Sequence, residues 1–84
     1  MKVEIITPEK IIYSRECYAV QARSNDGLFE VMDNHAPMLA AIDGGKIKIL
    51  EQKDTTPKFF NASKGILEVK DNLVKILLVE STEN

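Results

Sequence analysis

Short apolar segments alternate with turn signals along this chain, at intervals of about ten residues. Within residues 18–23, 46–49 and 67–70, apolar and polar side chains alternate with a period of two. This period places the apolar set on one face of an extended strand, whereas a helix repeats its apolar face every 3.6 residues. The pattern therefore predicts a series of half-buried β-strands.

Several connections between these segments carry residues that adopt left-handed backbone at low cost. Asp43-Gly44-Gly45 and Asn25-Asp26-Gly27 are predicted turns, because glycine adopts positive φ freely. Asp71-Asn72 is predicted to be a two-residue hairpin turn, since both side chains tolerate that conformation. Residues 51–58 are polar and include a proline, which predicts a loose hairpin loop.

The segment 37–42 is compatible with two structures. A short helix would be capped by Asn34, would hold Pro37 near its first turn and would end at Gly44. A strand is the alternative, because Ala36 precedes a proline and is pushed toward extended backbone. Periodicity leaves both open.

The carboxyl-terminal part of the chain gives two further expectations. Residues 73–79 are apolar except for Lys75, which predicts a strand covered on both faces. The polar tail, residues 81–84, is expected to fray. The whole pattern predicts a single all-β domain over residues 1–84, with eight to ten strands in two antiparallel sheets.

Size and charge exclude several classes of protein. The chain has 84 residues and a net charge of −2, so it offers no basic field for nucleic acid or for anionic lipid. No apolar run approaches the ~20 residues of a spanning helix, which predicts no direct membrane insertion. The amino terminus is too short and too acidic for a signal peptide.

The residues that could carry chemistry are few. The chain has one histidine, one cysteine and no tryptophan. Cys17 is interpreted as a small side chain of a strand, and Asp33 with His35 as a hydrogen-bonded turn. No metal-ligand spacing, phosphate-binding loop or nucleophile elbow is present, so we expect no catalytic residue, metal or cofactor. The residues themselves support a soluble all-β interaction module.

Four segments, in this order and spacing, resemble the epsilon subunit of F-type ATP synthases. They are residues 7–14, 27–39, 41–49 and 63–77. The second contains His35-Ala36-Pro37, which the family also has after a turn. Three positions depart from the family pattern: Glu30 replaces a second glycine, Asp33-Asn34 replaces Pro-Gly, and Lys64 replaces the first glycine of a pair. These changes affect local backbone geometry and not the fold.

The resemblance implies a ten-stranded antiparallel β-sandwich, with residues 37–42 as a strand and without the family's usual C-terminal helical hairpin. It implies a non-catalytic central-stalk (rotor) subunit on the cytoplasmic side of the bacterial inner membrane. Such a subunit binds the gamma subunit and the proteolipid ring, and couples ion-driven rotation to ATP synthesis. The matched positions facing gamma would be Thr7, His35 and Ala40. The loop facing the ring would be Asn25, Asp26, Gly27 and Leu28.

Because the helical hairpin carries self-inhibition and nucleotide binding in the family, the resemblance also implies a chain without either activity. The alternative function is a stand-alone β-sandwich adaptor unrelated to ATP synthase. Recovery of a gamma-like partner and proteolipid from membranes would separate the two hypotheses.

Overall fold

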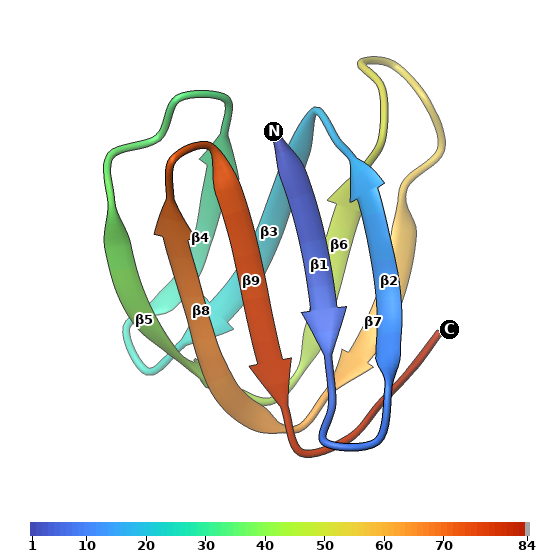
Figure 1. The fold of residues 1–84 in the computed structure, drawn as a ribbon, viewed down its shortest axis with the longest axis vertical. Coiled ribbons are helices and arrows are strands. Elements are labelled where there is room, and N and C mark those ends of the chain that lie inside the picture. The colour runs from blue at the N-terminus through green and yellow to red at the C-terminus, as the bar shows by residue number, and fades with distance from the viewer. Residues whose placement is uncertain (84) are drawn as a thin grey trace.

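A computed structural model describes residues 1–83, which form ten strands in two facing sheets (Figure 1). Sheet 1 holds, in spatial order, β2 (Ile11–Glu16), β1 (Lys2–Ile6), β9 (Leu73–Leu78), β8 (Lys64–Lys70) and β5 (Met38–Asp43). Sheet 2 holds, in spatial order, β10 (Ser81–Glu83), β7 (Lys58–Ala62), β6 (Lys46–Leu50), β3 (Ala19–Ser24) and β4 (Gly27–Met32). The predicted all-β sandwich is confirmed.

One strand pair departs from the expected antiparallel arrangement. β1 and β9 run parallel, with Lys2 opposite Leu73 and Ile6 opposite Leu77. No hairpin turn joins these two strands, since most of the chain lies between them. Their relative direction is therefore free of the constraint that a short turn imposes. Side-chain alternation is the same in both directions, so the sequence pattern does not distinguish them.

The core lies between the two sheets and is built from the inward side chain of every second residue. Its largest fully buried members include Phe60, Ile5 and Ile76. The ring of Tyr13 meets that of Phe60 edge to face, with centroids 5.2 Å apart and planes at 63°. Within residues 1–83, every buried side-chain nitrogen and oxygen has a hydrogen-bond partner. Such a core packs at the density of an organic crystal, so the sandwich is a stiff block.

Local backbone geometry follows the turn chemistry of the sequence. Asp71 and Asn72 have φ of 53° and 60°, which confirms the predicted left-handed hairpin turn. Asn34 has φ of 62°, a left-handed backbone conformation that asparagine adopts more readily than most residues. The ambiguous segment 37–42 is a strand, because β5 pairs with β8 along its whole length.

Two expectations differ from the structure. Residues 81–83 were expected to fray, but they form β10, and Ser81 Oγ donates a hydrogen bond of 2.7 Å to the Asn61 carbonyl of β7. The remaining residue of that tail, Asn84, lies outside the described residues. The expectation that β9 is covered on both faces was wrong. Its inward Ile76 is fully buried, yet Leu77 on the other face is 46% exposed. The apolar residues of this segment therefore lie on both faces of β9: one face enters the core, and the other is open to solvent.

Candidate functional site

The connections between strands gather at the two ends of the sandwich (Figure 1). The end that carries Met1, here called the amino end, holds the connections 33–37, 51–57 and 71–72. The opposite, distal end holds the connections 7–10, 25–26 and 44–45. A partner can therefore meet either end or one of the two outer sheet faces.

The structure does not bring the three predicted gamma-facing residues together. Thr7 lies at the distal end, where its hydroxyl donates to the Lys10 carbonyl at 3.2 Å and its side chain is nearly buried. His35 lies at the amino end and is exposed. Ala40 lies within β5, half-buried, on the same face of the strand as the core residue Ile42. These residues could share a partner only if it spanned the length of the sandwich.

His35 is held in a defined orientation. Its backbone N–H donates to the Met32 carbonyl at 3.2 Å, and its Nδ1 donates to the Ala36 carbonyl at 2.7 Å. With the proton on Nδ1, the neutral ring presents Nε2 as a hydrogen-bond acceptor. The turn predicted from Asp33 and His35 is present, although Asp33 contacts the amino terminus and not the imidazole.

The four residues predicted to face the ring form a tight tip. Asn25 and Asp26 are the two turn residues between β3 and β4, and Gly27 begins β4 with φ of 117°. Ser24 stiffens the turn, since its Oγ accepts from the Asp26 N–H at 3.2 Å and donates to the Gly27 carbonyl at 3.3 Å. Leu28 projects into solvent and is 66% exposed.

An open hollow of about 430 Å³ joins this tip to β5. Asn25 and Asp26 line one side of it, while Ala40 and Ala41 line the other. The structure therefore places one residue of the predicted gamma set beside the predicted ring set. Sequence spacing gave no indication of this, because sixteen or so residues separate the two sides along the chain.

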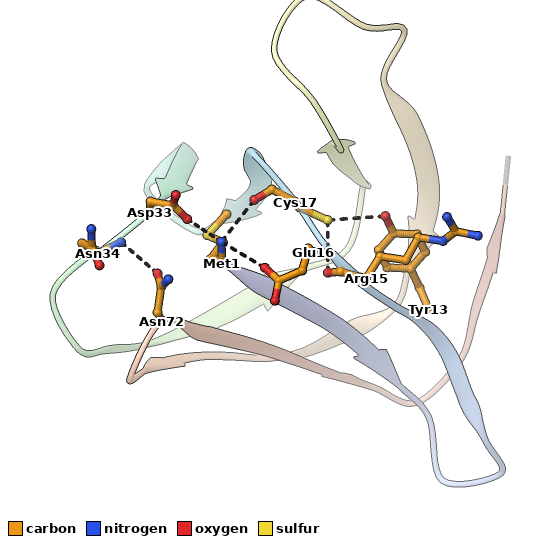
Figure 2. A network of polar contacts seen from close by, with 8 residues as sticks. All are labelled: Met1, Tyr13, Arg15, Glu16, Cys17, Asp33, Asn34 and Asn72. Atoms are coloured by element: carbon orange, nitrogen blue, oxygen red, sulfur yellow. Dashed lines mark hydrogen bonds and ion pairs between the residues drawn. The ribbon is translucent and has the colours of Figure 1, made fainter.

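A polar network at the amino end joins segments that are distant in sequence (Figure 2). The Met1 α-amino group donates to the Cys17 carbonyl at 3.3 Å and to a carboxylate oxygen of Asp33, and it lies 3.5 Å from Glu16 Oε2. The Asn34 N–H donates to Asn72 Oδ1 at 2.9 Å. These bonds connect the amino terminus, the β2–β3 turn, the 33–37 connection and the β8–β9 turn. No pattern in the sequence indicated this network.

A second polar cluster surrounds the single cysteine. The Tyr13 hydroxyl donates to Glu51, and the Cys17 thiol lies 3.4 Å from that hydroxyl and donates to the Arg15 carbonyl. Lys58 Nζ is 3.2 Å from Glu51 Oε2. Burial raises the pKa of the Cys17 thiol, which keeps it protonated and unreactive, whereas the Tyr13 hydrogen bond lowers the pKa of Glu51. Cys17 is buried as expected, but it lies between β2 and β3 and not within a strand.

The amino-end network predicts a specific pH dependence. The hydrogen bond to Asp33 is the main cause that raises the pKa of the Met1 α-amino group above 8.0. Since this pKa is higher in the folded chain, the stabilisation is complete below about pH 8 and is lost as pH rises through the folded pKa. Asp33→Asn should lower the free energy of unfolding at pH 7 by about 1 kcal/mol and flatten its decline above pH 8.

Urea unfolding at a series of pH values between neutral and alkaline measures both effects. Glu16→Gln is the matched control, because Glu16 is more exposed and contributes less to the raised pKa. Identical alkaline slopes in Asp33→Asn and the unsubstituted chain would contradict the assignment.

Within residues 1–83, no group of three or more His, Cys, Asp or Glu side chains is arranged to hold a metal ion. The described surface has two ends, an edge hollow and the outer faces of two sheets.

The family model for the ATP synthase Delta/Epsilon chain, beta-sandwich domain, matches residues 1–84. The chain belongs to this family. The ATP synthase epsilon chain of Chlorobium limicola is 42% identical over 79 residues, which cover 94% of this chain and 88% of that one. The epsilon chain of Chlorobaculum tepidum is 40% identical over 78 residues, which cover 93% and 86% of the two chains. The resemblance seen in the four sequence segments is confirmed.

Relatives in the family differ in length. The match to the ATP synthase epsilon chain of Leptospira interrogans is 35% identical and covers 92% of this chain but only 59% of the relative. This chain therefore corresponds to most of the Chlorobium and Chlorobaculum proteins and to a little over half of the Leptospira protein. Membership of this family confirms the prediction of a non-catalytic component of ATP synthase.

Solved structures share the fold. A chain in the central stalk/c-ring structure of Tetrahymena thermophila mitochondrial ATP synthase superposes with a TM-score of 0.82, covering 98% of this chain and 65% of that one. A chain in the OSCP/F1/c-ring structure of the Euglena gracilis enzyme gives 0.86, covering 96% and 51%. Both are 22% identical, so these likenesses show a common fold.

Proposed function

We propose that this chain acts as a rotor-stalk subunit of an F-type ATP synthase, binding the gamma subunit and the proteolipid ring so that ring rotation is transmitted to the catalytic head. Its family membership carries the proposal. The Tetrahymena chain with the same fold comes from a central stalk/c-ring assembly, and the Euglena chain comes from an OSCP/F1/c-ring assembly. The place of action would be the cytoplasmic side of the bacterial inner membrane.

The architecture suits a part that transmits torque. A coupling subunit must resist deformation between two partners, and a densely packed sandwich does so. The tip at residues 25–28 supplies a contact point for the polar loops of the ring, because its turn is fixed by Ser24 and its Leu28 is exposed. His35 supplies a directional acceptor for gamma at the amino end. The described residues include no helix that is long and apolar enough to span a membrane.

Recovery of the assembled complex from membranes tests this proposal. The tagged chain should co-purify with gamma and proteolipid, whereas a stand-alone adaptor would recover neither. Leu28→Asp should reduce proteolipid recovery about tenfold or more if Leu28 is an anchor, since it places a charge in a desolvated contact. His35→Ala should weaken the recovery of gamma. It should leave binding of the chain to the purified proteolipid ring unchanged.

Lys53→Glu serves as the charge control, because Lys53 is exposed in the 51–57 connection, which lies on the opposite side of the amino end from the 33–37 connection and far from the tip (Figure 1). Thermal unfolding of each variant checks that the sandwich remains folded. Undiminished recovery of proteolipid with Leu28→Asp would remove the tip from the ring contact.

A further inference from the structure

The outer face of sheet 1 carries a row of apolar residues that includes none of the predicted gamma-facing or ring-facing residues. Strand register places Ile6 of β1 opposite Leu77 of β9, Leu77 opposite Ile66 of β8, and Ile66 opposite Ala41 of β5. These four residues lie side by side across four neighbouring strands, and together with Ile11 of β2 they are here called the outer row. Ile11 of β2 continues the row, since it pairs with Ile6.

Side chains of the outer row face away from the core. Their chain neighbours Ile5, Ile76 and Leu67 are fully buried between the sheets, so alternation turns the row outward. Ile66 and Leu77 are both 46% exposed, and Leu39, on the same face of β5 as Ala41, is 71% exposed. A solvated face of a sheet usually carries polar residues, and contiguous apolar patches of roughly 300–600 Å² often mark binding surfaces.

The next row toward the amino end limits the patch. There the register aligns Glu4 with Lys75, Lys75 with Glu68, and Glu68 with Leu39, so this row is charged on β1, β9 and β8 and apolar on β5. Ser14 and Lys2 also contact Glu4, at 3.2 Å and 3.9 Å. The apolar zone is therefore narrow along the strands and long across them, with two carboxylates and one ammonium group along its border.

We infer that the outer row binds an amphipathic α-helix of the partner stalk subunit, an inference that rests on the proposed function. Backbone groups within a sheet are already paired, so a segment laid on its face must satisfy its own backbone hydrogen bonds, as a helix does. Five strands at about 4.8 Å spacing give a row of about 19 Å, the length of ~13 helical residues. The helix contributes apolar residues at i, i+3 or i+4 and i+7, with basic side chains toward Glu4 and Glu68.

A second copy of this chain fits the row less well. A stable interface needs about 800 Å² from each partner, so two copies would have to cover more of the sheet face than the outer row and Leu39. Two sheet faces of this chain packed together would also bury the charged row of Glu4, Lys75 and Glu68, whose desolvation opposes association. A helix covers the narrow apolar zone and leaves these charges at its solvated border.

Binding of the purified chain to the gamma subunit of the same ATP synthase tests the inference. Ile66→Lys and Leu77→Lys should each weaken the complex about tenfold or more. Phe59→Lys is the matched control, because Phe59 is an exposed apolar residue on the outer face of sheet 2, and its binding should be unchanged. Circular dichroism melting of each variant reports folding, and light scattering reports dimers.

A photo-crosslinker at Leu39 supplies a measurement that does not depend on disrupting the sheet. The inference expects crosslinks to gamma residues spaced three or four apart, and crosslinks to a non-helical segment would overturn it. Full binding by folded Ile66→Lys and Leu77→Lys would overturn it while leaving the proposed function intact. Absence of gamma binding by the unsubstituted chain would reject the proposed function itself. A dimer of the unsubstituted chain that Leu77→Lys dissolves would assign the row to a second copy and overturn the helix.

Discussion

Gly65→Ala is expected to lower the free energy of unfolding by about 3 kcal/mol, near the upper end of overpacking effects. A Cβ at this position would lie 2.1 Å from the Leu77 carbonyl oxygen and 2.7 Å from Leu78 Cδ2. The nearer atom belongs to the backbone of β9, which is hydrogen-bonded on both sides, to β1 and to β8. The clash cannot be relieved by a rotamer change, so β8 and β9 must separate. Urea or thermal unfolding measures the loss.

Lys64→Ala is the control for the glycine substitution. Lys64 is adjacent in β8 but exposed, and its ion pair with Asp43 is long, at 3.9 Å. Its replacement should change the free energy of unfolding by less than about 0.5 kcal/mol. A Gly65→Ala variant as stable as Lys64→Ala would show that the two strands can move apart at little cost.

Phe60→Ala is expected to lower the free energy of unfolding by about 3–5 kcal/mol. Phe60 is 1% exposed and is among the largest fully buried side chains. Its removal leaves a cavity between the sheets and deprives the Tyr13 ring of its edge-to-face neighbour. For a domain of this size each kcal/mol shifts the melting temperature by roughly 4–8 °C, so the midpoint should fall by more than about 12 °C.

Phe59→Ala provides a control within the same strand. It removes the same number of atoms from a side chain that is 36% exposed on the outer face of sheet 2. Its expected effect is about 1 kcal/mol or less, because much of the ring already meets water. Equal losses for Phe59→Ala and Phe60→Ala would contradict the assignment of Phe60 to the core.

Gly65→Ala and Phe60→Ala are expected to affect binding because they make the sandwich less rigid. A rotor subunit that loses several kcal/mol unfolds locally more often, and local opening of β8 and β9 would also disrupt the outer row. Binding defects of Gly65→Ala and Phe60→Ala are therefore expected to follow their loss of stability. Defects of Ile66→Lys are expected without a comparable loss, and comparison of the two classes separates packing from contact.

Most strands and turns followed from the amino-acid sequence alone. Period-two alternation predicted β3, β6 and β8, because every second side chain of these strands must enter the core. Asp71 and Asn72 gave their turn because both tolerate positive φ. The segment 37–42 needed the family resemblance, since its residues suit a helical turn and a strand equally well.

The pairing of strands and the exposure of the outer sheet faces followed from tertiary packing. The parallel pairing of β1 with β9 joins residues about seventy positions apart, and local alternation carries no information on such a pairing. That pairing aligns Ile6 with Leu77 and so creates the outer row. The same limit explains why β9 was wrongly expected to be covered on both faces. The type of an apolar residue does not tell whether its side chain faces the core, a partner or water, because that depends on which strands surround it.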